Sequence, residues 1–183
     1  MTPSAAATST WNIDPTHSHA EFKVRHLMIS NVRGSFPKIS GVLTLHESDL
    51  GQSQVEATID VASIQTRDEQ RDGHLKSSDF FDVEKYPTMT FKSTKVTATA
   101  TGEGTVAGDL TIRDVTKPVV FEVEGPTAPT KDPWGNLRVG VAATTKISRK
   151  DFGLVYNATL ETGGLLIGDE IAIALEVQFV KAA

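Results

Sequence analysis

Three side chains with recognisable chemistry, Arg71, Asp72 and His74, lie within a four-residue stretch near the middle of the chain. An arginine guanidinium binds two phosphate oxygens at once, so this cluster is a candidate clasp for a polar headgroup such as a diphosphate or a quinone ring. Asp72 would repel a phosphate unless Arg71 neutralised it. The alternative interpretation is therefore a salt-bridge cluster that holds a helix against its support.

Histidines and carboxylates elsewhere in the chain suggest a second hypothesis, a metal-dependent or acid/base enzyme. His17 and His19 share parity on an extended segment, so their rings would lie on one face, whereas His26 has the opposite parity. A metal site would need carboxylates that the fold brings next to the histidines. Asp151, Arg149 and His26 could instead form an acid/base group. The chain has no nucleophile elbow, phosphate loop or His-Glu-x-x-His motif. An enzyme that uses His17, His19 and Asp151 stays an alternative, and we predict no catalytic residue, no metal and no cofactor.

The composition limits the partners. The 183 residues include 23 acidic and 18 basic side chains, for a net charge of -5, and 39% are hydrophobic. Nucleic-acid binding needs a dense basic face, which this balance argues against. The sequence also has no compact Lys/Arg run that would draw the protein to an anionic membrane. Without cysteine, neither a disulfide nor a thiolate is available.

The start of the chain, MTPSAAATSTW, lacks the basic and apolar regions of a secretory signal. No apolar run approaches the ~18 residues that span a bilayer. We therefore predict a soluble, cytoplasmic protein without stable membrane insertion, or a periplasmic one if a signal was removed. We expect a disordered leader over residues 1–9 and a single domain over residues 10–183.

Alternation of apolar and polar residues dominates the rest of the chain and is typical of half-buried strands. It predicts about eight strands, within residues 20–26, 39–45, 55–61, 89–91, 106–112, 119–123, 137–147 and 171–179. No helices of crossover length separate them, which favours antiparallel pairing. So many strands leave exposed edges unless the sheet closes on itself. We predict an all-β fold, an extended antiparallel eight-stranded barrel.

One segment interrupts this pattern, a helical insertion around residues 67–82. Thr66-x-x-Glu69 matches a capping box, and the residues from Arg67 to about Lys76 suit a short helix. A helix in a barrel protein must dock on the wall or across a mouth, so this segment is the first candidate for a gate. Phe80 and Phe81 follow it, and we expect one to anchor the helix and the other to border the interior.

The order and spacing of several motifs identify a family. They are Asp14-x-x-His17-Ser18, Gly34-x-Phe36, Arg71-Asp72-x-His74-Leu75, Asp79-Phe80-Phe81-Asp82-Val83, Tyr86-Pro87, Gly108-x-Leu110-Thr111-Ile112, Thr116-Lys117-Pro118 and Arg149-x-Asp151-Phe152-Gly153. With these motifs, the chain from Trp11 to Val180 resembles the YceI-like proteins, lipocalin-like barrels that bind polyisoprenoid lipids. It departs from the family in lacking an export signal and in carrying Asp114 where a hairpin glycine is usual.

The resemblance implies a non-catalytic barrel whose apolar tunnel holds a long isoprenoid lipid or quinone tail, for carriage, storage or sensing. Small residues on apolar strand faces (Gly41, Ala57, Gly108 and Ala143) are expected to leave the channel open. A stress-response structural protein with a collapsed tunnel is a second alternative, and a homodimer is an expected assembly. The candidate ligand-binding residues, some of which are expected to pack only as core, are Phe22, Val24, His26, Phe36, Arg71, Asp72, His74, Leu75, Phe80, Phe81, Phe91, Leu110, Ile112, Phe121, Val141 and Phe152.

Overall fold

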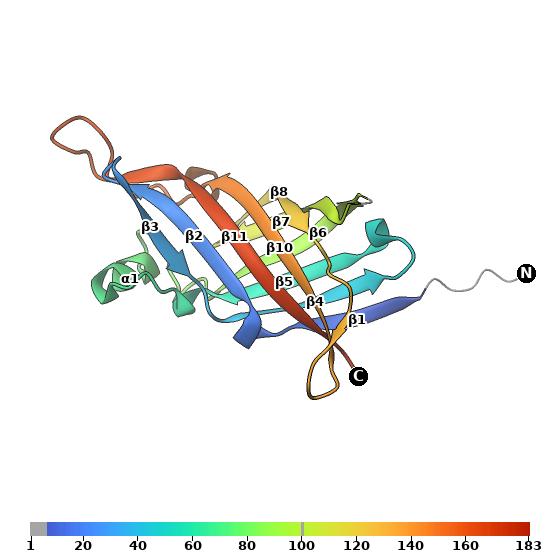
Figure 1. The fold of residues 1–183 in the computed structure, drawn as a ribbon. Helices are drawn as coiled ribbons and strands as arrows, with labels where there is room; N and C mark the ends of the chain where they lie inside the picture. Colours follow the sequence, from blue (N-terminus) through green and yellow to red (C-terminus); the bar gives the residue numbers. More distant parts are fainter. Residues whose placement is uncertain (1–6, 100) are drawn as a thin grey trace, which may run out of the picture.

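The fold is all-β, as predicted (Figure 1). The computed structural model describes residues 7–99 and 101–183. Within them, eleven strands form a single antiparallel sheet and α1 (Glu69–Lys76) is the one α-helix. The strands are β1 (Thr8–Ile13), β2 (His19–His26), β3 (Ser30–Ser35), β4 (Ile39–His46), β5 (Gln54–Asp60), β6 (Thr88–Ala98), β7 (Glu103–Ile112), β8 (Val115–Glu124), β9 (Thr130–Lys131), β10 (Leu137–Ser148) and β11 (Ile167–Lys181).

The sheet closes into an eight-stranded barrel through the pairing of β10 with β11. The ring runs β11-β1-β4-β5-β6-β7-β8-β10 and returns to β11. The closing register extends from Arg138 opposite Val180 to Ser148 opposite Glu170. The predicted lipocalin-like barrel is therefore confirmed.

Two strands that the alternation did not predict, β1 and β3, complete the wall. β1 and β2 lie one after the other along the same edge of β11, separated by the 3-10 turn η1 (Pro15–His17). β3 then pairs with β2, and β4 pairs with β1. The predicted leader needs a correction, because Thr8 and Ser9 are the first residues of β1, which its pairing with β4 keeps in the sheet. The first six residues of that leader lie outside the described residues.

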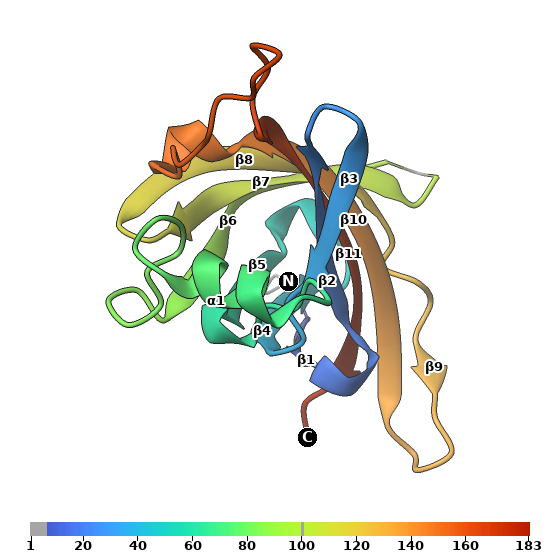
Figure 2. The same cartoon turned by 90° about the vertical axis from the view of Figure 1, so that its left-hand side faces the viewer.

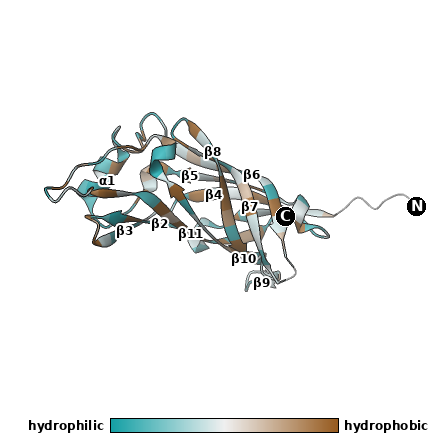
Figure 3. Cartoon of the chain, turned by 90° about the horizontal axis from the view of Figure 1, so that it is seen from above, coloured by the Kyte–Doolittle hydropathy of each residue, from teal (hydrophilic) through white to brown (hydrophobic). Residues whose placement is uncertain are grey.

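Buried and exposed residues alternate along the strands, and Figure 3 shows hydrophobic and hydrophilic residues mixed along the same strands. In β2, Ala20 is buried and Phe22 and Val24 are half-buried, while Lys23 and Arg25 are exposed. One interior cluster includes Trp11, Ile39, Leu110, Phe121, Val139, Phe152 and Phe179. Burial of apolar area on this scale is the main term that stabilises the barrel.

The interior glycines do not leave the open channel that the sequence suggested. A Cβ on Gly108 would lie 2.5 Å from the Phe91 ring and 2.5 Å from the Lys92 carbonyl oxygen. The Phe22 ring covers Gly34 in the same way, and Ile13 covers Gly41. These glycines give room to neighbouring side chains, whereas the other two small residues of the prediction, Ala57 and Ala143, do line the cavity.

The helix begins two residues later than predicted. Asp68, not Thr66, is its N-cap, and the Asp68 carboxylate accepts a hydrogen bond from the Arg71 amide (3.0 Å). Arg67 has a left-handed backbone (φ 66°), which is incompatible with a helix starting there. No residue of α1 is buried, and the helix lies at one end of the barrel (Figure 2), the end called here the α1 end. From Ser78 to Lys85 the chain forms turns.

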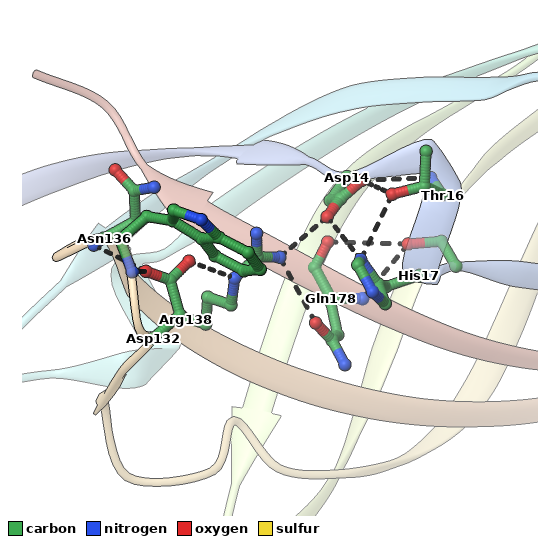
Figure 4. Close-up of polar contacts among 9 residues, drawn as sticks. Asp14, Thr16, His17, Asp132, Asn136, Arg138 and Gln178 are labelled. Atoms are coloured by element: carbon green, nitrogen blue, oxygen red, sulfur yellow. Dashed lines mark hydrogen bonds and ion pairs between the residues drawn. The ribbon is translucent and has the colours of Figure 1, made fainter.

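At the opposite end, three charged residues tie β9–β10 to the start of the barrel wall (Figure 4). Arg138 donates from Nη1 to Asp14 (2.7 Å) and from Nε to Asp132 (2.8 Å). Asp14 also accepts from the Thr16 hydroxyl (2.7 Å) and is bonded to His17 Nδ1 (2.8 Å). We call Asp14, Asp132 and Arg138 the Asp14 clasp.

The clasp shifts the titration of its members. Hydrogen bonds from Thr16, then from Arg138 and His17, hold the pKa of Asp14 well below its usual range. Arg138 lowers the pKa of Asp132, and hydrogen bonds to Asp14 and Asp132 raise the pKa of Arg138. A carboxyl whose pKa is depressed by folding adds stability above its unfolded pKa of about 3.9, and this stability is lost as the pH falls toward the folded pKa.

At the α1 end, a buried arginine holds the chain through hydrogen bonds to backbone carbonyl groups. Arg149 opens the 3-10 turn η4 (Arg149–Phe152) and is only 3% exposed. Its Nε donates to the Gly168 carbonyl (2.9 Å), and its Nη1 donates to the carbonyls of Leu154 (2.6 Å) and Tyr156 (2.8 Å). Burial lowers the pKa of Arg149, and the Asp169 charge partly opposes this. The guanidinium therefore holds the irregular segment after η4 against the start of β11.

We predict that Asp14→Asn lowers the melting temperature by roughly 3–8 °C near neutral pH, because the variant loses the charge that Arg138 binds. The difference from the wild type should narrow as the pH falls below about 4, since the carboxyl of the unfolded wild type then takes up a proton while the folded one is still charged. Thermal unfolding followed by circular dichroism at both pH values measures this. Asp109→Asn, at an exposed site outside the ion pairs, is the control. An equal loss at both pH values would show that the charge is not responsible.

We also predict that Arg149→Met lowers the free energy of unfolding by about 2–4 kcal/mol, because three carbonyl oxygens lose their charged donor. Urea unfolding measures the loss, and hydrogen exchange should accelerate at residues 154–168. The matched control is Lys150→Met, which removes only an exposed ion pair with Asp169 and should cost less than about 1 kcal/mol. Similar losses in both variants would contradict the anchoring role.

Candidate ligand-binding cavity

The barrel contains a cavity of about 510 Å³. Its volume falls in the ~300–1,000 Å³ range of small-molecule sites, and its wall is mostly apolar. Leu50, Val96 and Thr105 line it at the end away from the helix, while His26, His74 and Tyr156 line it at the α1 end. Because both ends contribute, the cavity follows the long axis of the barrel and suits an elongated ligand.

Most of the candidate residues line this cavity. They are Phe22, Val24, His26, Phe36, Arg71, His74, Leu75, Phe80, Phe81, Phe91, Leu110, Ile112, Phe121 and Val141. Phe152 does not line it, because its side chain is buried within the packed core instead. Asp72 does not line it either, because its carboxylate accepts hydrogen bonds from the Thr66 amide (2.9 Å) and hydroxyl (2.5 Å).

Arg71 and Asp72 mainly hold Thr66 in place by hydrogen bonds. Arg71 donates from Nε to the Thr66 hydroxyl (2.8 Å) and from Nη2 to the Thr66 carbonyl (2.5 Å). Together with Asp72, it fixes the chain entering α1. These contacts are hydrogen bonds to Thr66 and not the salt bridges of the alternative interpretation, which the described residues do not form at Arg71 or Asp72. Arg71 nevertheless contributes to the cavity wall.

His74 belongs to a different contact, an aromatic group that covers the α1 end. Its Nε2 lies 2.8 Å from an Asp79 carboxylate oxygen. Its ring stands edge-on to Phe80 (centroids 5.0 Å apart) and to Tyr156 (4.8 Å). The second phenylalanine, Phe81, packs edge-on against Phe36 deeper in the barrel (5.9 Å). The adjacent phenylalanines thus point to different neighbours, but both line the cavity, so the expected division between an anchoring and a lining residue is not seen.

The two ends of the cavity differ in charge. Basic side chains line the α1 end, where His26 and Arg149 join Arg71 and His74. Arg25 and Glu21 also border the cavity, although the side chains of both are exposed on the outer face of β2. At the far end the polar lining includes Glu103 and uncharged groups such as Ser53 and Gln54. The α1 end is therefore the better place for an anionic or hydrogen-bonding group.

Several wall residues were missed from the candidate set. Ile171, Ile173, Leu175 and Val177 of β11 line the cavity. Their alternation did mark them as facing one way, so the signal was present in the sequence. Tyr156 carries no such signal, because it lies in an irregular segment outside the strands, where its carbonyl accepts a hydrogen bond from Arg149.

The residues of the enzyme alternative do not come together. His17 lies in η1 beside Gln178, whereas Asp151 lies in η4 next to the opposite end of β11. Glu170 and Gln178 are eight positions apart along β11, which is roughly 26 Å at the strand rise of ~3.3 Å. Among residues 7–99 and 101–183, no group of three or more His, Cys, Asp or Glu is placed to hold a metal ion.

Within the same part of the chain, none of the helices has the length and hydrophobicity required to cross a membrane.

Comparison with known proteins supports the architecture. A UPF0312 protein of Staphylococcus aureus is 36% identical over 170 residues, covering 92% of this chain and 96% of its own length. A YceI protein of Campylobacter jejuni, solved by crystallography, is 32% identical and covers 87% of this chain and 90% of its own, with a TM-score of 0.73.

A more distant structure shares the fold. A polyisoprenoid-binding domain from Saccharophagus degradans, implicated in plant cell wall breakdown, is 16% identical, covers 94% of this chain and 98% of its own, and has a TM-score of 0.67. The YceI-like domain matches residues 11–179, which include every strand of the closed barrel at least in part. The chain therefore belongs to the YceI-like family.

Proposed function

We propose that this protein binds a long-chain polyisoprenoid lipid in the barrel cavity, without catalysis, for carriage, storage or sensing. The observation that carries the proposal is the elongated apolar cavity of about 510 Å³. The fold relationship to a polyisoprenoid-binding domain supports the same ligand class.

The energetics favour a slender hydrocarbon chain. Each methylene moved from water to an apolar wall contributes about 0.8 kcal/mol. Ordering the chain and losing its free translation oppose binding, but a long prenyl chain buries many such groups. An unoccupied apolar cavity also forfeits packing contacts, which a ligand would restore.

The charge difference between the two ends orients the ligand. We place the polar head at the α1 end, near His26, His74 and Tyr156, and the tail toward Val106 and Leu50. A phosphate would benefit from the arginines there, whereas a quinone ring would use hydrogen bonds and aromatic contacts. Polyprenyl phosphate and long-tailed quinone are thus the two ligands to compare.

The collapsed-barrel alternative predicts a filled interior, and the cavity argues against it. Ala143 lines the cavity midway along β10, so a larger side chain there would enter the space proposed for the ligand. Gly108→Leu cannot serve for this purpose, because its new side chain would meet the backbone of Lys92 and the Phe91 ring.

We predict that Ala143→Trp and Val106→Trp each reduce uptake of a polyprenyl lipid by about tenfold or more, because the indole occupies the binding space. Delipidated protein would be offered polyprenyl phosphate, polyprenol or a long-tailed quinone, and bound lipid would be counted by native mass spectrometry. The melting temperature should change by less than about 5 °C, since the ring enters open volume and not a filled core.

Val120→Trp is the matched control, because Val120 is 55% exposed on the outer wall and the same indole is added outside. Wild type that takes up none of the three lipids would refute the proposal. Undiminished uptake by both cavity variants would place the ligand elsewhere.

A further inference from the structure

The hairpin between β2 and β3 ends in three exposed apolar residues. Leu27, Met28 and Ile29 are 36%, 57% and 73% exposed. The hairpin projects at the α1 end, beside the loop of residues 155–166 (Figures 1 and 2). That loop carries two more of the exposed large apolar residues, Val155 and Leu165. We call Leu27, Met28 and Ile29 the apolar tip.

The turn of this hairpin does not use the residues that its backbone favours. Leu27 and Met28 both have left-handed φ angles, 53° and 63°. The Ile29 amide donates to the His26 carbonyl (3.1 Å), so Leu27 and Met28 are the two central residues of the turn. A turn with positive φ at both central positions strongly prefers Asn-Gly, and bulky residues there are strained. Leu27 and Met28 stay 36% and 57% exposed, and Arg25 donates a hydrogen bond to the Met28 carbonyl (3.2 Å), so packing offsets only part of this strain. A strained turn of exposed apolar residues points to a function.

The tip is continuous with the cavity wall. The Leu27 amide donates to the Leu166 carbonyl (2.9 Å), and Leu166 lines the cavity, as does His26 on the other side of Leu27. The Met28 side chain reaches to within 3.6 Å of where a Cβ on Gly164 would lie. The tip therefore stands at the end of the cavity where the ligand head is placed.

The outer face of the same hairpin is basic. Lys23, Arg25 and Arg33 are exposed, and Lys23 lies directly opposite Arg33 across the two strands. Like charges at opposed positions are destabilising. None of the three makes an ion pair among the residues that the structure describes.

The acidic neighbours leave this basic face largely uncompensated. Glu21 is the outward residue opposite Ser35 at the base of the hairpin, and Glu161 lies in the adjacent loop. Asp169 pairs with Lys150 and Glu170 with Lys146. From Phe22 to His46 the chain has no Asp or Glu at all. The sequence showed no compact basic run because inward residues separate the three cations, and strand pairing brings them together.

We propose that the β2–β3 hairpin docks the α1 end on an anionic lipid bilayer, with the apolar tip in the headgroup–acyl boundary and Lys23, Arg25 and Arg33 on lipid phosphates. Apolar side chains flanked by basic ones are the pattern of reversible interfacial binding. The inference rests on the proposed function, because docking at this end would align the cavity with the membrane that supplies or receives the isoprenoid.

The test is co-sedimentation of the full chain with vesicles of phosphatidylcholine alone or mixed with phosphatidylglycerol, neither containing isoprenoid. We expect binding to the mixed vesicles and little to the neutral ones. Leu27→Asn combined with Met28→Gly should reduce the partition coefficient about tenfold while suiting the turn. Lys23→Gln combined with Arg33→Gln should reduce it by about fivefold per charge removed and flatten its salt dependence.

Matched controls lie away from the hairpin. Lys95→Gln with Lys131→Gln removes two exposed cations. Val42→Thr with Val120→Thr removes two exposed apolar side chains. Neither pair should change the partition coefficient for the mixed vesicles. Trp134 is 79% exposed at the opposite end of the barrel. Its fluorescence should not shift to the blue when vesicles are added, because such a shift would mean that the opposite end enters the membrane.

Wild type that stays in the supernatant, tip variants that bind normally, or self-association in place of vesicle binding would each overturn the proposal. Prenyl uptake from solution is measured on the same proteins. Uptake without docking would refute this inference alone, whereas docking without uptake would refute the proposed ligand function.

Discussion

The pairing of β11 along both of its edges is the constraint on which the structure depends. One edge carries β10 over the register from Arg138–Val180 to Ser148–Glu170, and the other carries β1 and β2 in succession. An open sheet of this size would expose unpaired edges, and a barrel removes them only if the last strand meets the first. The long last strand, Ile167–Lys181, allows two separate segments to share one edge, so the wall tolerates the interruption at η1.

Closure also explains why the cavity can persist. Strand number and tilt set the diameter of a barrel, so its interior cannot collapse as a loosely packed helical core can. Aromatic rings occupy the space beside the glycines of neighbouring strands, as Phe91 does at Gly108 and Phe22 at Gly34, and both rings line the cavity. The small side chains of Ala57 and Ala143 line it as well.

The fold could largely be predicted, because the alternation of apolar and polar residues is a local signal for strands. The need to pair the edges of so many strands then favours a closed barrel. β3 was missed since its inward positions include Val32 and Gly34, which give little alternation, and β1 was missed since only Trp11 and Ile13 are large. The Thr66 capping box failed because the Thr66 hydroxyl donates to Asp72. The polar anchors could not be predicted, since Asp14 and Arg138 are 124 positions apart and only the closed register brings them together.

The same alternation links the inside of the barrel to its surface. On β2, Phe22 and Val24 line the cavity, while Lys23 and Arg25 form part of the proposed docking face. A register shift of one residue would exchange the two sets and bury the cations. Selection on either face therefore acts on the same strand register, which β11 on one side and β3 on the other hold in place. A ligand-binding wall and a membrane-facing surface can thus be built from a single eight-residue strand.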